Sequence, residues 1–498
     1  MSAKQRFAGI AAAAVALLAG RAAHANGAFP FVNQLVANPD DPDQLVLRGT
    51  FGLVVSKDRG KTWDWLCETG MGYRDVLPPI AVLPSGAVLL ALPTGISRSD
   101  SSWCGFGSGT GIEGQIVDVS AVRAEPGTAI ALSVDLLART SRVWESTDDG
   151  ASWQPLGAPI ENFQATTLDA AATEPDVIYV SGSTVGADAD DFLLRSADRG
   201  LSWQQHQVPS TTLASSVPYI GAVAPEAIDT VYVRRDGNPG VVLVTRNGGE
   251  TFDEVLRVDG LVNSLALSPD GSTLLAGNLA SGLYRTDTAS LEVQHVACKG
   301  VTCLSWNEGG LYACGDINFN RFLVGKSLDD GASFDVLLSP SCVRGPLDCD
   351  TTTSIGAKCP KEWPLVRASL GPETCTPSTP PPRDDSCLTD AGGAGSVGDS
   401  GDAGVSVAGA PDGAVSDAGV PDTDGGGLGG AGSRGHPSSS AGETVVTTEE
   451  TTTTPPEGNG GCGCSTAPRS QRLWSLACLS ALLMLRRRRL TRRAVSDP

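Results

Sequence analysis

Short runs of apolar residues, each about the length of a β-strand, recur through residues 29–338 and alternate with turns that contain Pro, Asp and Gly. Two stretches show this clearly: VNQLVANPDDPDQLVLRGTFGLVVS at 32–56 and LVNSLALSPDGSTLLAGNLASGLYR at 261–285. Apolar runs bounded by such turns predict β-hairpins. The pattern therefore favours an all-β fold built from repeated hairpins.

A short motif with the pattern Ser/Thr-x-Asp-x-Gly-x-Ser/Thr-aromatic occurs five times. The copies are SKDRGKTW from Ser56, STDDGASW from Ser146, SADRGLSW from Ser196, TRNGGETF from Thr245 and SLDDGASF from Ser327. Their starts lie 90, 50, 49 and 82 residues apart, so each wide gap is close to two repeat units. A period of roughly 40–50 residues is typical of a propeller or another repeat array.

Each motif is predicted to form a tight turn between two strands. The glycine supplies a positive φ, the aspartate accepts hydrogen bonds from backbone amides of the turn, and the aromatic residue opens the next strand. The glycines are Gly60, Gly150, Gly200, Gly249 and Gly331; the acceptors are Asp58, Asp148, Asp198, Asn247 and Asp329; the aromatics are Trp63, Trp153, Trp203, Phe252 and Phe334. Because every position has a structural task, we interpret the motif as structural rather than catalytic.

The motif resembles the Asp-box, or BNR repeat, of sialidases, sortilin-type receptors and photosystem II assembly factors, which are β-propellers. The resemblance implies that these turns lie at the blade periphery, away from the active face. Degenerate copies at 97–103 and 286–291 fill the wide gaps. Counting them gives a single propeller of seven blades, each of about 41 to 50 residues, within residues 26–340. Six or eight blades stay open, because the first and last blades can share strands.

Thirteen cysteines occur, and ten of them are candidates for disulfides in an exported protein. The ten are Cys67, Cys104, Cys298, Cys303, Cys314, Cys342, Cys349, Cys359, Cys375 and Cys387. Eight of these lie between 298 and 387, so we expect bridges to clamp a Cys-rich extension, residues 341–387, onto the last blade. A bridge between Cys67 and Cys104 is a candidate link between the first two blades. No CxxC pair or nearby histidine pair supports zinc, so we predict no metal site and no cofactor.

The two ends of the chain indicate export. Residues 1–25 have the charged start, apolar core and Ala23-His24-Ala25 cleavage site of a secretory signal peptide. Residues 388–460 are rich in Gly, Ala, Asp and Thr and contain few large apolar residues, so we expect a disordered stalk.

Residues 461–498 combine a Gly-Cys element, an apolar stretch at 473–485 and an arginine cluster. This layout resembles the C-terminal sorting signal of myxobacterial surface proteins. The resemblance implies a temporary membrane anchor that export and processing machinery removes, with a modified cysteine as the final anchor. The residues concerned are Cys462 or Cys464 and the cluster Arg486, Arg487, Arg488 and Arg489. A permanent tail anchor is the alternative interpretation.

The charge distribution excludes one class of partner. The formal net charge is −20, and the two ends carry +3 and +7, which leaves −30 for the middle of the chain. Nucleic-acid binding requires a basic patch, so we expect no nucleic-acid partner. An acidic, solvated extracellular surface is the simplest interpretation.

Few residues point to catalysis. Sialidases carry an Arg-Ile-Pro element and an arginine cluster, but Arg48 is the only arginine between the predicted cleavage site and Ser56. No nucleophile elbow accompanies His206 or His295. We therefore predict a binding or adhesion module, tethered to the cell surface, for an extracellular polysaccharide or protein. A glycoside hydrolase that uses paired carboxylates is the alternative.

Overall fold

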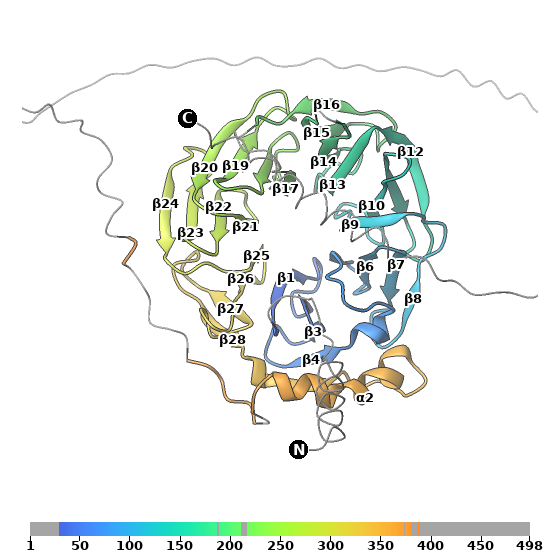
Figure 1. The fold of residues 1–498 in the computed structure, drawn as a ribbon, viewed down its shortest axis with the longest axis vertical. Helices are drawn as coiled ribbons and strands as arrows, with labels where there is room; N and C mark the ends of the chain where they lie inside the picture. Colours follow the sequence, from blue (N-terminus) through green and yellow to red (C-terminus); the bar gives the residue numbers. More distant parts are fainter. Residues whose placement is uncertain (1–28, 187–188, 211–216, 373, 380–385, 389–498) are drawn as a thin grey trace, which may run out of the picture. The chain divides into compact units, whose positions relative to one another are not determined.

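The computed structural model describes residues 29–186, 189–210, 217–372, 374–379 and 386–388. These residues form a ring of seven antiparallel blades, a β-propeller, as Figure 1 shows. The prediction of seven blades is confirmed. The predicted signal peptide, nearly all of the predicted stalk and the predicted sorting segment lie outside the described residues.

The first four blades follow one another along the chain. Blade 1 contains β1 (Val32–Ala37), β2 (Leu45–Gly49), β3 (Gly52–Ser56) and β4 (Trp63–Leu66). Blade 2 contains β5 (Ile80–Val82), β6 (Val88–Leu92), β7 (Gly95–Ser99) and β8 (Phe106–Ser108). Blade 3 contains β9 (Gln115–Ala121), β10 (Ala129–Asp135), β11 (Thr140–Ser146) and β12 (Gln154–Glu161). Blade 4 contains β13 (Phe163–Ala170), β14 (Ile178–Thr184), β15 (Asp191–Ser196) and β16 (Gln204–Gln207).

Three further blades complete the ring. Blade 5 contains β17 (Pro218–Val223), β18 (Val231–Arg235), β19 (Gly240–Thr245) and β20 (Asp253–Val258). Blade 6 contains β21 (Val262–Leu267), β22 (Thr273–Asn278), β23 (Gly282–Asp287) and β24 (Val293–Ala297). Blade 7 contains β25 (Cys303–Asn307), β26 (Gly310–Cys314), β27 (Val324–Ser327) and β28 (Asp335–Leu338). In every blade the first strand lies nearest the centre of the ring (Figure 1).

The ring closes without strand sharing between its first and last blades. Each blade takes its four strands from one continuous stretch of chain. Blade 7 meets blade 1 through side-chain contacts, among them a 2.5 Å hydrogen bond from Thr302 Oγ1 to Val32 O. Backbone pairing between the two ends of the ring comes instead from β29 (Val343–Pro346), which follows blade 7 and pairs with β4 of blade 1.

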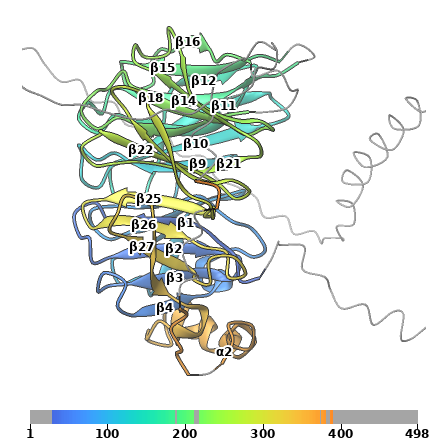
Figure 2. The same cartoon turned by 90° about the vertical axis from the view of Figure 1, so that its left-hand side faces the viewer.

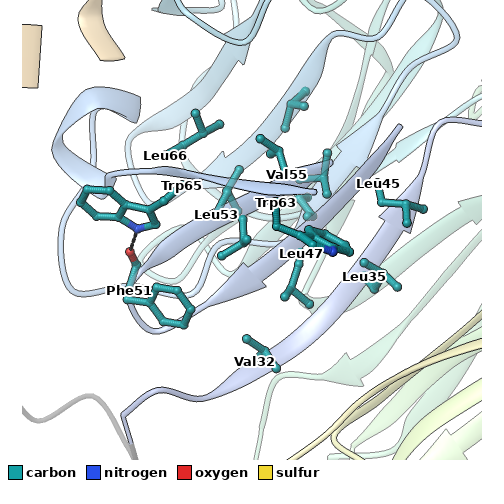
Figure 3. Packing of buried hydrophobic residues seen from close by; sticks show 14 of the residues in the cluster. Val32, Leu35, Leu45, Leu47, Phe51, Leu53, Val55, Trp63, Trp65 and Leu66 are labelled. Atoms are coloured by element: carbon teal, nitrogen blue, oxygen red, sulfur yellow. Dashed lines mark hydrogen bonds between the residues drawn. The ribbon is translucent and has the colours of Figure 1, made fainter. Parts of the chain in front are cut away.

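Apolar side chains from adjacent blades pack together and form the core between them. In blade 1, alternate residues of β2 and β3 and the aromatic residues of β4 point into this core, as Figure 3 shows. Trp63 and Trp65 are each only 1% exposed. The Trp65 indole satisfies its N–H by donating to Phe51 O at 2.5 Å (Figure 3).

A C-terminal strap, residues 339–388, continues from blade 7 along the outside of blade 1. It begins with the 3₁₀ turn η2 (Pro340–Cys342), and β29 (Val343–Pro346) then pairs in parallel with β4 as a fifth strand. The helix α2 (Ser354–Ser369) follows and lies at the rim of the disc (Figures 1 and 2). The chain then returns to η2, where Ser341 Oγ donates to Thr376 O at 3.1 Å.

Tertiary packing stabilises the helix α2 more than its own sequence does. Pro360 and Pro364 lie inside it, and each proline lacks the N–H of a helical hydrogen bond. Ile355 is fully buried, and the Trp363 ring lies 5.4 Å from the Trp65 ring of blade 1. We interpret packing against blade 1 as the main reason that this segment is helical.

Five disulfides join the ten cysteines named above. The pairs are Cys67–Cys359, Cys104–Cys349, Cys298–Cys387, Cys303–Cys314 and Cys342–Cys375. Disulfides on this scale indicate an exported protein.

Two expectations about the pairing are wrong. Cys67 and Cys104 do not bond to each other, because each lies against the strap and pairs with a strap cysteine at Cα–Cα distances of 5.2 and 5.5 Å. The strap is not clamped onto the last blade either: its bridges reach blades 1 and 2 and, through Cys298, the end of blade 6. The physical reason is its path, which leaves blade 7 and crosses the seam.

Candidate functional site

The alternation of strand direction gives the disc two different faces. The connections between the second and third strands of a blade, and those between one blade and the next, emerge on one face, which we call the loop face. The connections between first and second strands, and between third and fourth strands, emerge on the other, which we call the turn face. The five motif copies connect third and fourth strands, so all of them lie on the turn face.

The polar side chains of the first motif copy form hydrogen bonds with one another and with the backbone of the turn. Ser56 Oγ accepts from Gly60 N at 2.8 Å and donates to Asp58 Oδ1 at 2.8 Å. Asp58 also accepts from Thr62 N at 2.8 Å and from Thr62 Oγ1 at 2.6 Å. Partial burial raises the pKa of the Asp58 carboxyl, but the hydrogen bonds from Thr62 and Ser56 outweigh this effect and lower it.

The other copies repeat this geometry. The residue before the glycine also adopts a positive φ, 58° at Arg59 and 57° at Asp149, a feature that the pattern did not predict. Equivalent bonds occur in the remaining copies around Ser146 and Asp148, Ser196 and Asp198, Thr245 and Asn247, and Ser327 and Asp329. Their aromatic residues are buried or half-buried between blades: Trp153, Trp203, Phe252 and Phe334.

The innermost strands carry bulges that aim side chains toward neighbouring blades. A single extra residue interrupts the register of the first strand in five blades; these residues are Asn33, Val117, Thr166, Gly221 and Asn263. A β-bulge redirects side chains locally and often occurs beside functional sites. Asn33, Gly221 and Asn263 line a cavity of about 180 Å³ together with Gln34 and Arg234.

Side chains near the channel join neighbouring blades by hydrogen bonds to their backbone. Gln34 bonds reciprocally with Ile80, at 3.1 Å through its Nε2 and 3.2 Å through its Oε1. Thr166 Oγ1 donates to Pro218 O at 2.6 Å. Comparable bonds run from Arg234 to Val262 O, from Asn263 to Val301 O and from Thr302 to Val32 O. These polar groups already act in holding the ring together.

Two carboxylates join blades 3 and 4 in the same way. Asp118 on β9 accepts from Leu168 N on β13 at 3.0 Å. Asp169 on β13 accepts from Ser120 Oγ on β9 at 3.0 Å. Burial raises the pKa of the Asp118 carboxyl to about 7, with a smaller contribution from the charge of Asp169, while Arg48 and the backbone hydrogen bonds act in the opposite direction. Burial also raises the pKa of Asp169, opposed by Ser120 and Arg123.

The raised pKa of Asp118 leads to a prediction about stability. A carboxyl whose pKa is higher in the folded protein stabilises the fold fully below its unfolded pKa, and that contribution is lost as the pH rises through about 7. Asp118→Asn keeps an acceptor for Leu168 N but does not ionise. The variant should therefore gain roughly 1 to 3 kcal/mol of unfolding free energy relative to the parent when the pH rises from about 4.5 to 8.

Urea unfolding of both proteins at these two pH values measures the difference. Asp259→Asn, at an exposed position on a loop, is the matched control and should behave as the parent does. A pH-independent difference between Asp118→Asn and the parent would contradict the prediction.

The exposed apolar side chains concentrate on the loop face. Nine large apolar side chains are exposed within the described residues. Six lie on the loop face: Leu136, Leu137, Leu261, Leu279 and Phe319 on its connections, and Phe29 just before β1, which starts on this face. Leu201 and Leu328 lie on the turn face, and Leu365 lies on α2. The loop face also carries an open depression of about 580 Å³ between the connections of blades 2 and 3.

Flat aromatic rings are scarce on the surface. All eight tryptophans and six tyrosines of the described residues are buried or half-buried, so the exposed rings are those of Phe29 and Phe319. Both histidines of the described residues, His206 and His295, also make local contacts. The His295 ring stacks on Tyr284 at 4.4 Å, and the His206 ring lies 2.9 Å from where a Cβ on Gly249 would stand.

The candidate anchoring cysteines Cys462 and Cys464 and the cluster Arg486–Arg489 lie outside the described residues. Within the described residues, no helix is long and apolar enough to span a bilayer, and no cluster of three or more metal-ligating side chains occurs. Sequence analysis missed Asp118 and Asp169, because a carboxylate on an inner strand carries no signal in the hydrophobic pattern.

Comparison with known proteins finds structural similarity only at low sequence identity. No family model and no curated protein matches the chain. The chain is similar to an extracellular domain from B. thetaiotaomicron, with a TM-score of 0.42 and 12% identity over 58% of this chain and 37% of that one. For YCF48 from Cyanidioschyzon merolae the TM-score is 0.42 and the identity 13%, over 57% and 92% of the two chains.

An ancestral GH74 enzyme gives a TM-score of 0.35 and 15% identity, over 62% of this chain and 38% of that one. The chain thus spans less than two fifths of the length of the B. thetaiotaomicron and GH74 structures.

Proposed function

We propose that this chain is an exported Asp-box propeller, tethered at the cell surface by its C-terminal segment, that binds an extracellular protein or polysaccharide on its loop face. The observation that carries this proposal is the uneven distribution of exposed apolar side chains, six on the loop face and two on the turn face. Concentrated exposed apolar side chains mark interaction surfaces.

The polar groups around the channel support binding rather than catalysis. The side chains that approach the channel from blades 1, 4, 6 and 7 bond to the backbone of the next blade, as described for Gln34, Thr166, Asn263 and Thr302. A catalytic group has to reach its substrate within hydrogen-bonding distance. Side chains that already hydrogen-bond to the next blade stabilise the ring. Breaking those hydrogen bonds to reach a substrate would destabilise it.

Hydrolysis of a glycan is the second candidate, and Asp118 is the observation that favours it. A carboxyl with a pKa of about 7 near a second carboxylate has the protonation behaviour that a general acid needs. Both Asp118 and Asp169 accept hydrogen bonds from the opposite blade, which favours a structural role for the pair.

One experiment separates the two functions. The purified chain, with its disulfides formed, is incubated with insoluble bacterial and plant polysaccharides and with immobilised extracellular proteins, and both retention and release of reducing ends are measured. We expect retention on at least one ligand without release. Asp118→Asn should be retained as strongly as the parent, because the substitution lies away from the loop-face side chains.

Matched surface variants locate the binding face. Leu136→Asp combined with Leu261→Asp and Leu279→Asp should reduce retention at least about tenfold, since charges replace apolar contacts. Leu201→Asp with Leu328→Asp places the same charges on the turn face and should leave retention unchanged. Release of reducing ends that Asp118→Asn abolishes would overturn the binding proposal in favour of a hydrolase, and absence of retention on every ligand would count against it.

A further inference from the structure

Three exposed apolar side chains lie on linked connections along one sector of the loop face, around blades 6 and 7. We call Leu261, Leu279 and Phe319 the apolar arc; they are 55%, 51% and 68% exposed. They lie on the connections 259–261, 279–281 and 315–323, and a fourth connection, 298–302, contacts the last two. Leu136 and Leu137 lie on blade 3, elsewhere on the same face.

Hydrogen bonds fix the first two loops of the arc to each other and to the blade beneath. Asn278 Nδ2 donates to Asp259 O at 2.9 Å, which joins the loop of Leu261 to that of Leu279. Leu279 N donates to Asn263 Oδ1 at 3.1 Å, and Asn263 Nδ2 donates to Val301 O at 2.7 Å. The bulge residue Asn263 thus supports the arc from the channel side.

The remaining two loops complete the unit. A Cβ on Gly300 would lie 2.0 Å from Asn278 O and 2.6 Å from Leu279 Cα, so this loop packs directly on the turn that carries Leu279. Asn320 Nδ2 donates to Gly300 O at 3.1 Å and joins the loop of Phe319. The disulfide from Cys298 to Cys387 attaches the same unit to the strap.

The arc therefore presents apolar side chains on a prearranged backbone. A surface that is already ordered loses little conformational entropy when a partner binds, which increases affinity for a given contact area. Exposed leucines on disordered loops would lack this advantage. The arrangement points to a surface shaped for contact rather than to isolated exposed residues.

The chemistry of the arc favours a protein over a glycan or a lipid. Leucine side chains cannot bond to sugar hydroxyls, so pressing them onto a polysaccharide would leave those hydroxyls unsatisfied. The net charge of −20 opposes adsorption to anionic lipid and favours a basic partner. These connections carry Lys299 and Arg321 as well as Asp259 and Asp316, so the acidic character comes from the chain as a whole.

We infer that the apolar arc is the docking site for a protein partner that presents apolar side chains among Lys or Arg residues. The inference rests on the proposed binding function and assigns its ligand class and its place on the loop face. Apolar residues of the partner would cover Leu261, Leu279 and Phe319, and its basic residues would be attracted by the net negative charge of the chain.

A library of random 15-residue peptides displayed on phage is the probe that tests this inference. The library is selected on the purified full chain, and synthetic copies of the enriched peptides are titrated by fluorescence polarisation. We expect enriched peptides to combine apolar residues with Lys or Arg. Their affinity for Leu261→Asp/Leu279→Asp should fall at least about tenfold, and it should weaken as salt is raised.

Two further double variants separate failure of the inference from failure of the proposed function. Leu201→Asp/Leu328→Asp, on the turn face, should bind the peptides as the parent does. Loss of binding in Leu136→Asp/Leu137→Asp alone would overturn the arc while leaving a loop-face function in place. Loss of peptide binding in the turn-face variant alone would overturn both the arc as docking site and the proposed loop-face function. Thermal unfolding of each variant, compared with the parent, shows that the fold is retained.

Three other outcomes would also overturn the inference. These are failure to enrich any peptide, enrichment of acidic peptides, and arc-dependent retention on neutral phosphatidylcholine vesicles. Self-association of the parent that Leu261→Asp/Leu279→Asp abolishes would assign the arc to a second copy of this chain instead. Sedimentation velocity of both proteins measures this last outcome.

Discussion

A chain that lacks both bridges from the strap to blades 1 and 2 should lose roughly 4 to 8 kcal/mol of unfolding free energy. The variant replaces Cys67, Cys359, Cys104 and Cys349 with serine. The two bridges span 292 and 245 residues and, together with the pairing of β29 with β4, tie the chain after blade 7 to the blades at the start of the ring. Cross-links that close long loops restrict the unfolded chain most, which is why the expected loss is large.

The two bridges should not contribute additively. While one bridge remains, the second closes only a short loop, made of the chain between Cys67 and Cys104 and the chain between Cys349 and Cys359. Each single removal should therefore cost about 1 to 3 kcal/mol, less than half of the loss expected for the double removal. Guanidinium unfolding of the single and double variants measures these differences.

Cys303 and Cys314 provide the matched control. Their bridge joins adjacent strands of blade 7, spans 11 residues and does not cross the seam, and both cysteines are buried. Replacing this pair with serine removes, from one blade, one disulfide that is as buried as Cys67–Cys359. A double strap variant that is no less stable than this control would show that the strap does not close the ring.

Replacing Trp63 with alanine should cost about 3 to 5 kcal/mol. The side chain is 1% exposed, belongs to the core of blade 1 (Figure 3) and donates its indole N–H to Gly60 O at 2.8 Å. Alanine would leave a cavity and remove the bond that ties the aromatic ring to the turn. Thermal or denaturant unfolding of the purified variant measures the loss.

The chain itself indicates the conservative substitution at this position. Phe252 and Phe334 occupy the equivalent site in two other motif copies, so the turn accepts a phenyl ring. Trp63→Phe should cost only about 1 to 2 kcal/mol, the effect of the lost hydrogen bond and a small cavity. Equal losses in Trp63→Phe and Trp63→Ala would contradict a packing role for the ring.

The blades were predictable because their signals are local. A glycine at a positive φ, an acceptor two residues earlier and an aromatic residue at the next strand occur within eight residues, and five copies set the period. Even the degenerate copies kept their hairpins: β7 leads to Trp103, which is fully buried, and β23 leads to Leu291. Seven blades followed from that spacing.

The strap and the candidate site depend on contacts between distant residues. Nothing near Cys67 indicates that its partner lies 292 residues away, and the two prolines of α2 argue locally against a helix. Asp118 acquires its raised pKa from burial against blade 4, and Leu279 its exposure from a turn supported by Asn263. Such features arise from the closed ring, so no short window of sequence contains them.

The bridge between Cys298 and Cys387 also determines how tension passes through the molecule. A pull on the chain beyond Cys387 reaches the end of blade 6 directly through this bond. The two cysteines are 89 positions apart in the sequence, and the chain between them, which includes blade 7, β29 and α2, lies outside the line of force. In a propeller tethered by its C-terminal end, this disulfide would therefore carry the mechanical load to blade 6, and the load would bypass the closing seam between blades 7 and 1.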